Sequence, residues 1–502
     1  MLATIPTASL LGVTGWPVTV EVHVSGGLPG FTVVGLPDAS CREARDRVRA
    51  ALLSSGLPWP QRRVTVNLAP SGVRKVGSGF DLAVAMGLLV ASGHLSAREV
   101  AGMGFIGELG LDGTVRAVPG VVSLVEALDA DVVVVPPASA VEAGVPDRHL
   151  VRAVPTLRSL VEAVQGSAPW PDVEPPPVPE EPPTPLELAD VRGQPFARQA
   201  LEVAAAGGHH LLLVGPPGGG KTMLAQRLVG LLPPLERAAA LEATKVHSAA
   251  GEALPPSGLL TRAPFRAPHH SSSLVSLVGG GSGRLRPGEI SLAHGGVLFL
   301  DELGEFNASS LDALRQPLEE GAVRVARAQG ATSFPARFLL VAASNPCPCG
   351  RVGVACRCSE GARQRYARRF SGPLLDRFDL RLLVDRPDPH DLLRATAGEP
   401  TAVVAARVAC ARRRALKRQG CVNAHLVSAR LDADAPLAPN AKARLAQAFC
   451  GGQLTARGCD RVRRVARTVA DLEGHDGPVQ EGHLLTALLL RAEIELDGGA
   501  YR

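Results

Sequence analysis

Residues 211–228 read LLLVGPPGGGKTMLAQRL, and this stretch decides the fold class of the chain. The apolar run Leu211–Val214 predicts a buried strand, and the residues from 221 onward have a helical pattern. Between them lies the G-x4-G-K-T spacing of a phosphate-binding loop, in the strand-loop-helix order that this motif requires. Such a unit indicates an α/β protein with a mostly parallel sheet and helices on both faces.

The loop predicts a nucleotide site. Its glycines let backbone N–H groups surround phosphates at the start of a helix. We expect Lys221 to reach the β and γ phosphates and the Thr222 hydroxyl to ligate Mg²⁺, so ATP and Mg²⁺ are the expected cofactors. A glycine-rich turn without a ligand is the less favoured interpretation. The expected binding residues are Gly215, Pro216, Pro217, Gly218, Gly219, Gly220, Lys221 and Thr222.

Two further apolar strands end in polar residues. Val297–Leu300 precedes Asp301 and Glu302, and we expect Asp301 to complete the Mg²⁺ shell and Glu302 to polarise the attacking water. The third strand, Phe338–Ala343, leads to Asn345, whose amide could orient that water or touch the γ phosphate. Taken alone, Asn345 is more often a turn residue, but the order of the three strands favours a role in the site.

Arg377 lies in GPLLDRFD, residues 372–379, among apolar residues typical of a subunit contact. One interpretation is an arginine finger that enters the site of a neighbouring subunit and neutralises charge in the transition state. The other is a structural ion pair with Asp376 or Asp379.

Length and composition exclude several classes of protein. The chain has 502 residues, of which 46% are hydrophobic and 20% charged, so two or three folded domains are expected. Its longest apolar runs are far shorter than the roughly 18 residues of a membrane span. The N-terminus lacks the positive segment of a signal peptide, so we expect a cytoplasmic protein without a membrane partner.

The proline-rich, acidic run SAPWPDVEPPPVPEEPPTP, residues 167–185, predicts a linker. Alternation in Val18–Val24 and a strand at Val64–Leu68 indicate an α+β unit before it, and helical patterns continue from about residue 390. The expected domains are 1–165, a linker at 166–186, a nucleotide-binding core at 187–390 and a helical domain at 391–502.

The net charge is +5, and the basic excess lies after the linker. Arginine runs at 363–369, 412–418 and 461–467 fit a polyanion such as DNA, or equally a solvated helix face.

Four cysteines have the spacing C-x-C-x6-C-x-C and follow Asn345 directly. Four thiolates can surround Zn²⁺ tetrahedrally, although C-x-C is tighter than the usual spacing. Structural zinc is favoured over free thiols. The four are Cys347, Cys349, Cys356 and Cys358.

Together these residues resemble the AAA+ ATPases. The longer strings at 264–306 (PFRAPHHSSSLVSLVGGGSGRLRPGEISLAHGGVLFLDELGEF) and 371–380 (SGPLLDRFDL) resemble the magnesium-chelatase-like branch and the YifB/ComM family. The resemblance covers nearly all of residues 1–495 except the linker. It implies a P-loop parallel sheet with a helical C-terminal lid, assembled as a homo-oligomeric ring that we expect to be a hexamer.

The resemblance also implies two pore-facing elements, an insert near 274–289 and a hairpin near 321–334. Arg324 and Arg327 are expected at or near the tip of the hairpin, as contacts to nucleic acid. The second sensor arginine of the family corresponds to Arg457, with Arg461 as the alternative.

Residues 1–165 resemble the α+β Lon-protease-like domain (S5 domain 2-like) of the same family, through 76–85 (VGSGFDLAVA) and 106–113 (IGELGLDG). An active site of that type needs a serine and a lysine. No lysine follows Gly113 where the base would fall, and Ser78 is out of register with the nucleophile. The domain is therefore expected to be a proteolytically inactive scaffold.

We expect an ATP-dependent DNA motor. The ATPase chemistry follows from the residues, whereas branched or single-stranded DNA as substrate, and branch migration during recombination or natural transformation, follow from the resemblance. The alternative is a chelatase-type or protein-remodelling ATPase that acts on a protein partner.

Overall fold

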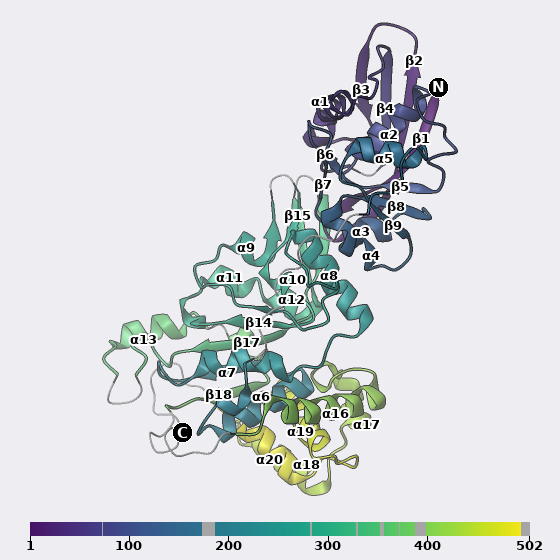
Figure 1. Cartoon of the computed structure of the whole chain (residues 1–502). Helices are drawn as coiled ribbons and strands as arrows, with labels where there is room; N and C mark the ends of the chain where they lie inside the picture. The colour runs from purple at the N-terminus through teal and green to yellow at the C-terminus, as the bar shows by residue number, and fades with distance from the viewer. Residues whose placement is uncertain are drawn as a thin grey trace.

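The computed structural model describes residues 1–72, 74–172, 186–281, 284–327, 330–351, 356–370, 372–386 and 398–492. The N-terminal part lies at one end and the C-terminal helices at the opposite end, with the nucleotide-binding core between them (Figure 1). Most of the expected linker, residues 173–185, lies outside the described residues.

The N-terminal part is built on a four-stranded sheet in the order β1-β2-β4-β3. Its strands β1 and β2 form an antiparallel hairpin, and β3 runs parallel to β4. All eleven residues of helix α2 are buried, as its nearly unbroken apolar sequence predicts. The elements are β1 (Leu2–Leu11), β2 (Thr14–Ser25), β3 (Gly30–Val34), α1 (Ala39–Ser54), β4 (Arg63–Ala69) and α2 (Asp81–Ala91).

A second, smaller layer completes this part. A three-stranded parallel sheet has the order β5-β8-β9, and a two-stranded ribbon joins β6 to β7. The expected α+β class is confirmed. The elements are β5 (Met103–Phe105), β6 (Glu108–Leu109), β7 (Val115–Arg116), α3 (Val121–Glu126), β8 (Val132–Val135), α4 (Ala140–Gly144), β9 (Leu150–Ala153) and α5 (Leu157–Val164).

The core contains a five-stranded parallel sheet in the order β11-β14-β17-β10-β18. Alternate residues of β10 belong to apolar clusters on opposite faces of this sheet, which explains its continuous apolar sequence. The predicted strands at 211–214 and 297–300 coincide with β10 and β14. The strands are β10 (Leu211–Val214), β11 (Phe265–Arg266), β14 (Val297–Leu300), β17 (Leu339–Ser344) and β18 (Leu380–Leu383).

Helices surround this sheet. They are α6 (Pro195–Gly207), α7 (Lys221–Leu228), α8 (Arg237–Ala250), α9 (Leu274–Val278), α10 (Glu289–Leu292), α11 (Ala308–Asp312), α12 (Arg315–Glu320), α13 (Glu360–Ala367) and α14 (Gly372–Leu375).

Two antiparallel hairpins occupy the segments expected to hold the insert and the pore-facing hairpin. The first pairs β12 (Gly279–Gly280) with β13 (Arg286–Pro287), and the second pairs β15 (Ala322–Arg327) with β16 (Gly330–Pro335).

The N-terminal part packs against α8. Lys245 forms an ion pair with Glu126 at 2.5 Å, and the Ser248 hydroxyl donates to the Glu142 carboxylate at 2.9 Å. The backbone N–H of Gly120 donates to the Ser248 carbonyl at 2.9 Å. These contacts attach the N-terminal part directly to the core, in addition to the chain connection.

The C-terminal part is helical, as expected. Its helices are α16 (Thr401–Gln419), α17 (Leu431–Asp434), α18 (Pro439–Cys450), α19 (Ala456–Leu472) and α20 (Glu481–Leu489). The carboxylate of Asp471, fully buried, ties three of its segments together. It accepts hydrogen bonds from Arg418 at 2.8 and 2.9 Å, from Arg467 at 3.2 Å and from Asn423 at 2.8 Å.

This network predicts a strong dependence of stability on Asp471. Replacing Asp471 by Ala leaves two arginines without their buried counter-charge, so we expect a loss of about 3–5 kcal/mol in the free energy of unfolding. Asp432→Ala is the control, because it removes the exposed partner of Arg463 and leaves no buried charge unpaired. Urea unfolding of both variants is the measurement, and equal midpoints would contradict the interpretation.

Candidate active site

The phosphate-binding loop connects β10 to α7 at the carboxyl edge of the parallel sheet. Gly218 and Gly220 have φ angles of 80° and 83°, the left-handed region that glycine adopts without strain. A Cβ on Gly215 would lie 1.9 Å from the carbonyl oxygen of Val384, so only glycine fits beside β18 at that position. The loop lines a cavity of about 400 Å³, together with Asp301, Glu302 and Asn345.

Lys221 is the first residue of α7, and its ammonium group points back over the loop. It donates to the carbonyl oxygens of Gly215 at 2.7 Å and Pro216 at 3.0 Å, and to the Asn345 side-chain oxygen at 3.3 Å. Burial lowers the pKa of Lys221, while the charges of Asp301 and Glu302 act in the opposite direction. The lysine therefore lies where the phosphates of a nucleotide would be cradled.

Thr222 and Asp301, the two expected Mg²⁺ ligands, lie side by side. The Thr222 hydroxyl donates to the Asp301 carboxylate at 2.7 Å, although 79 residues separate them in the chain. A hydroxyl and a carboxylate are hard oxygen donors of the kind Mg²⁺ prefers. This donor set, next to the loop and its lysine, fits a magnesium nucleotide.

Glu302 follows Asp301 and also lines the cavity. Its backbone is left-handed, with a φ of 51°, which is uncommon for a residue with a side chain. Its carboxylate oxygen lies 3.2 Å from Nδ1 of His270. His270 was not expected here, because no sequence motif relates it to Glu302.

Asn345 is held by a tyrosine that the sequence analysis also missed. The Tyr366 hydroxyl donates to the Asn345 carbonyl oxygen at 3.0 Å and lies 3.0 Å from the Ser344 hydroxyl. Burial raises the pKa of Tyr366 to about 12, so the phenol stays protonated and can donate. Asn345 is thereby fixed just after β17, and its side-chain oxygen faces Lys221.

Gln194, which precedes α6, supports the loop from outside. Its amide nitrogen donates to the carbonyl oxygens of Gly219 at 2.9 Å and of Asp385 at 3.2 Å. Arg386 donates to the Pro217 carbonyl at 3.2 Å. These contacts join the loop to the segments before α6 and after β18.

Arg377 and Arg457 lie outside this cavity. Arg377 forms an ion pair with Glu319 rather than with Asp376 or Asp379, so both partners named in the sequence analysis are wrong. Arg381 pairs with Asp376, and Arg461 pairs with Asp379 at 2.5 Å.

Arg457 is exposed in the first turn of α19. Arg461, its alternative as second sensor, is committed to the contact with Asp379 and also donates to the Arg377 carbonyl at 3.2 Å.

Arg324 is in the middle of β15, opposite Ser333, and not at the tip of the hairpin. Its side chain is 71% exposed and forms an ion pair with Glu320 at 3.0 Å. Arg327 is the residue of β15 that pairs with Gly330 at the closed end of the hairpin. Arg327 thus lies next to the tip, and Arg324 lies three residues before it along β15.

The two C-terminal arginine runs are largely engaged within the protein. Arg412 donates to the Ala205 carbonyl at 2.8 Å, Arg418 pairs with Asp471, and Arg463 pairs with Asp432 at 2.7 Å. These three side chains are therefore engaged within the protein, whereas Arg413 and Lys417 are exposed, so neither of the two alternatives holds for a whole run. Only part of the runs' positive charge is therefore available to bind an external polyanion.

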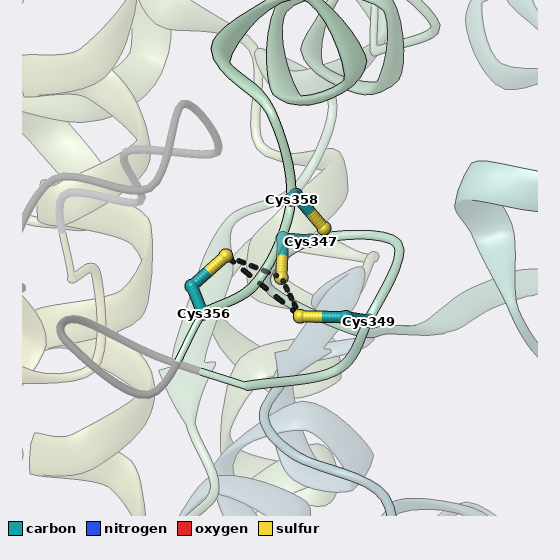
Figure 2. A group of neighbouring side chains, drawn as sticks. All are labelled: Cys347, Cys349, Cys356 and Cys358. Carbon is teal, nitrogen blue, oxygen red and sulfur yellow. Dashed lines mark hydrogen bonds between the residues drawn. The ribbon is translucent and has the colours of Figure 1, made fainter.

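The four cysteines of the spaced motif come together after β17. Their sulfur atoms all lie within 4.8 Å of one another. The Cys347 sulfur lies 3.3 Å from the Cys349 sulfur and 3.6 Å from the Cys356 sulfur. Figure 2 shows Cys347 near the centre of the group. Sulfurs bound to one tetrahedral Zn²⁺ at about 2.3 Å are about 3.8 Å apart. The cluster is consistent with a zinc site.

The thiols of Cys347 and Cys349 differ in pKa. Backbone N–H groups of Arg357 and Arg351 lower the pKa of Cys349 to about 6, whereas burial raises the pKa of Cys347 to about 12. The lowered pKa favours the thiolate form of Cys349, which is the form that binds a metal ion.

In the N-terminal part, Ser78 donates to the Glu108 carboxylate. Lys75 is buried and donates instead to the Pro70 carbonyl. Within the described residues, no serine–lysine pair is formed there.

Comparison with known proteins gives three matches along the chain. Residues 187–392 match the family described as magnesium chelatase, subunit ChlI; residues 20–139 match subunit ChlI of Mg-chelatase; and residues 398–491 match its C-terminal family. The first match covers the candidate site and implies an ATPase domain that uses ATP and Mg²⁺.

Full-length relatives are similar over almost the whole chain. An uncharacterized protein of Mycobacterium tuberculosis is 45% identical over 494 residues, covering 94% of this chain and 95% of the relative. The uncharacterized protein YifB of Escherichia coli is 42% identical, with coverage of 98% and 97%. The competence protein ComM of Haemophilus influenzae is 42% identical, with coverage of 99% and 98%.

Among the described residues, no helix has both the length and the apolar character of a membrane span.

The cysteine geometry predicts a bound metal ion. We expect purified protein to contain about one zinc per chain by elemental analysis, and we expect Cys349→Ser or Cys356→Ser to remove it and lower the thermal midpoint. Cys410→Ser is the control, because Cys410 is exposed and belongs to α16. Metal-free wild-type protein with an unchanged midpoint after chelation would rule out the zinc.

Proposed function

Because the chain belongs to the YifB/ComM family, whose members carry magnesium-chelatase ChlI-type domains, we propose that it is an ATP-hydrolysing, ring-forming motor that acts on DNA. The observation that carries the ATPase part is the convergence of five groups at one cavity. Three sheet strands bring them together from distant parts of the chain: Lys221, Thr222, Asp301, Glu302 and Asn345.

Each of these residues has a separate proposed role. The loop and Lys221 bind the phosphates, and Thr222 and Asp301 hold the Mg²⁺. When bound there, Mg²⁺ would supply positive charge that offsets the negative charge on the phosphate oxygens. The Glu302 carboxylate accepts a hydrogen bond from the attacking water and orients it, and the Asn345 amide fixes the γ phosphate or that water.

Arg377 is proposed to complete the site of a neighbouring subunit, in a homo-oligomer that we take to be a hexamer. Its charge is held by Glu319, whose carboxylate is 60% exposed, so a neighbour's phosphates could compete for the arginine. Arg457, exposed at the start of α19, is the proposed second sensor.

DNA is proposed as the substrate because the ComM relative is named for competence, the state in which cells take up DNA. Branched or single-stranded DNA and branch migration in recombination or natural transformation are the specific form of this proposal. The exposed Arg324 and the hairpin position of Arg327 support it. The C-terminal arginine runs add less support than their number suggests, because internal partners hold them.

A chelatase-type or protein-remodelling motor is the second candidate. The internal pairing of the arginines favours it, and so does the name of the matched domain family. A protein substrate would not require a phosphate-binding surface in the pore.

Glu302→Gln tests the hydrolytic site. The amide keeps the size of the side chain but cannot accept a proton from water, so we expect ATP binding to persist and turnover to fall by at least about 100-fold. The matched control is Glu305→Gln, three residues away, where the carboxylate pairs with Arg369. Steady-state ATPase rates and nucleotide binding are the measurements. Near-normal turnover in Glu302→Gln would show that the base is misassigned.

Replacing Arg324 and Arg327 together by Ala tests the DNA surface. Each lost phosphate contact should reduce the slope of log affinity against log salt by about one unit, while the basal ATPase rate is retained. Arg430→Ala serves as a control, because it lies in the C-terminal part and pairs with Asp434. Binding of branched and single-stranded DNA is measured between about 50 and 200 mM salt. If the wild-type protein binds neither branched nor single-stranded DNA, the protein-remodelling candidate replaces the DNA motor.

A further inference from the structure

The arginine run at 363–369 differs from the two C-terminal runs. Arg365 of α13 and Arg368, which caps the C-terminal end of that helix, are both exposed. Side chains three residues apart on a helix are neighbours, so the two lie on one face. Within the described residues neither forms an ion pair or a hydrogen bond through its side chain, whereas carboxylates on other helices hold Arg418 and Arg463. This face of α13 is therefore free to bind an external anion.

The segment that carries the four cysteines adds two more arginines. Arg351 and Arg357 are exposed, and they too have no side-chain partner in the part of the chain that the structure describes. The Cys347 thiol donates to the Arg351 carbonyl oxygen at 3.1 Å, so the cysteine cluster holds the backbone of this arginine. Residues 346–370 contain six arginines and one acidic residue, Glu360, so the positive charge of this segment is not neutralised within it.

α13 is anchored on its opposite face. The Tyr366 hydroxyl donates to the Asn345 carbonyl oxygen at 3.0 Å, and the Tyr366 ring meets Phe370 edge-on at 5.3 Å between ring centroids. Both aromatic residues belong to the apolar cluster on one face of the parallel sheet. Arg369 adds an ion pair with Glu305 at 3.2 Å. A fixed helix thus presents the exposed arginines, so binding does not require the helix itself to become ordered.

The chemistry of this surface favours a nucleic acid over a protein partner. Guanidinium groups match the geometry of phosphate oxygens. Interfaces between proteins have an apolar centre, whereas interfaces with DNA are polar and strongly positive. Among the described residues of 346–370, no large apolar side chain is exposed. The partner that fits is therefore a phosphate backbone.

This surface is separate from the hairpin that the proposed function assigns to DNA. α13 lies at one side of the core, whereas the hairpin β15–β16 lies at the end of the core that faces the N-terminal part (Figure 1). The arms of a branched DNA leave the junction in different directions, so one protein can contact two of them at separate surfaces.

We propose that Arg351, Arg357, Arg365 and Arg368 form a second DNA-binding surface, the α13 surface. It binds the phosphate backbone of one arm of a branched DNA while the hairpin β15–β16 holds another arm. This inference rests on the proposed action on DNA, and it assigns a preference for branched over single-stranded DNA to a surface outside the hairpin.

The test is the affinity of the full-length protein for a synthetic four-way DNA junction between about 50 and 200 mM salt. Replacing Arg365 and Arg368 together by Gln should reduce the slope of log affinity against log salt by about two units, because two phosphate contacts are lost. Replacing Arg351 and Arg357 together by Gln should have a similar effect. Binding of a single strand as long as one arm should change less, because the hairpin alone holds it.

The matched control replaces Arg45 and Arg49 of α1 by Gln. Both are exposed, and their loss changes the net charge of the protein by the same amount. Their helix also carries Glu43 and Asp46, so its charge is balanced locally. This control should keep the wild-type slope for the junction.

Three results would overturn the inference while the DNA motor stands. One is an unchanged slope in both arginine pairs when the wild-type protein binds the junction. Another is an equal loss of slope for the junction and the single strand. The third is a lower ATPase rate without DNA together with an unchanged slope, which would place the arginines at a neighbouring subunit. Wild-type protein that binds neither DNA overturns the proposed action on DNA, and the inference with it.

Discussion

The parallel pairing of β14, β17 and β10 is the constraint on which the site depends. In this register the three strands end at one edge of the sheet, so residues from three separate segments meet there. The hydrogen bond between Thr222 and Asp301 is a direct result of this register. A slip of one residue along β14 would turn Asp301 to the other face and separate the two oxygens.

A second constraint joins the sheet to the C-terminal helices. Burial raises the pKa of the Asp379 carboxyl, but the His209 contact and the Arg461 charge outweigh burial and hold that pKa well below its usual range. Asp379 therefore stays charged and keeps Arg461 of α19 against the loop that carries Arg377. In the proposed ring, the trans-acting arginine and the helix of the second sensor would move as one unit.

Local motifs made part of the site predictable. The loop at 215–222, the acidic pair at 301–302 and the four spaced cysteines each have a chemical reason for their spacing, and the structure brings the members of each group together. Gln194, His270 and Tyr366 were not predictable, because each acts on a residue far away in the chain. The partners of Arg418 and Arg463 in the two C-terminal runs were not predictable either, since Asp471 and Asp432 lie on other helices.

The amino-acid sequence by itself determined the class of the fold, the nucleotide loop and the family, since apolar periodicity and motif spacing are properties of neighbouring residues. The tertiary structure alone decided which charged side chains stay exposed and which form ion pairs within the protein. It also decided that Arg377 meets Glu319 and that Glu302 meets His270. The physical reason is that an ion pair depends on distance in space, and only the packing of the elements sets that distance for residues far apart in the chain.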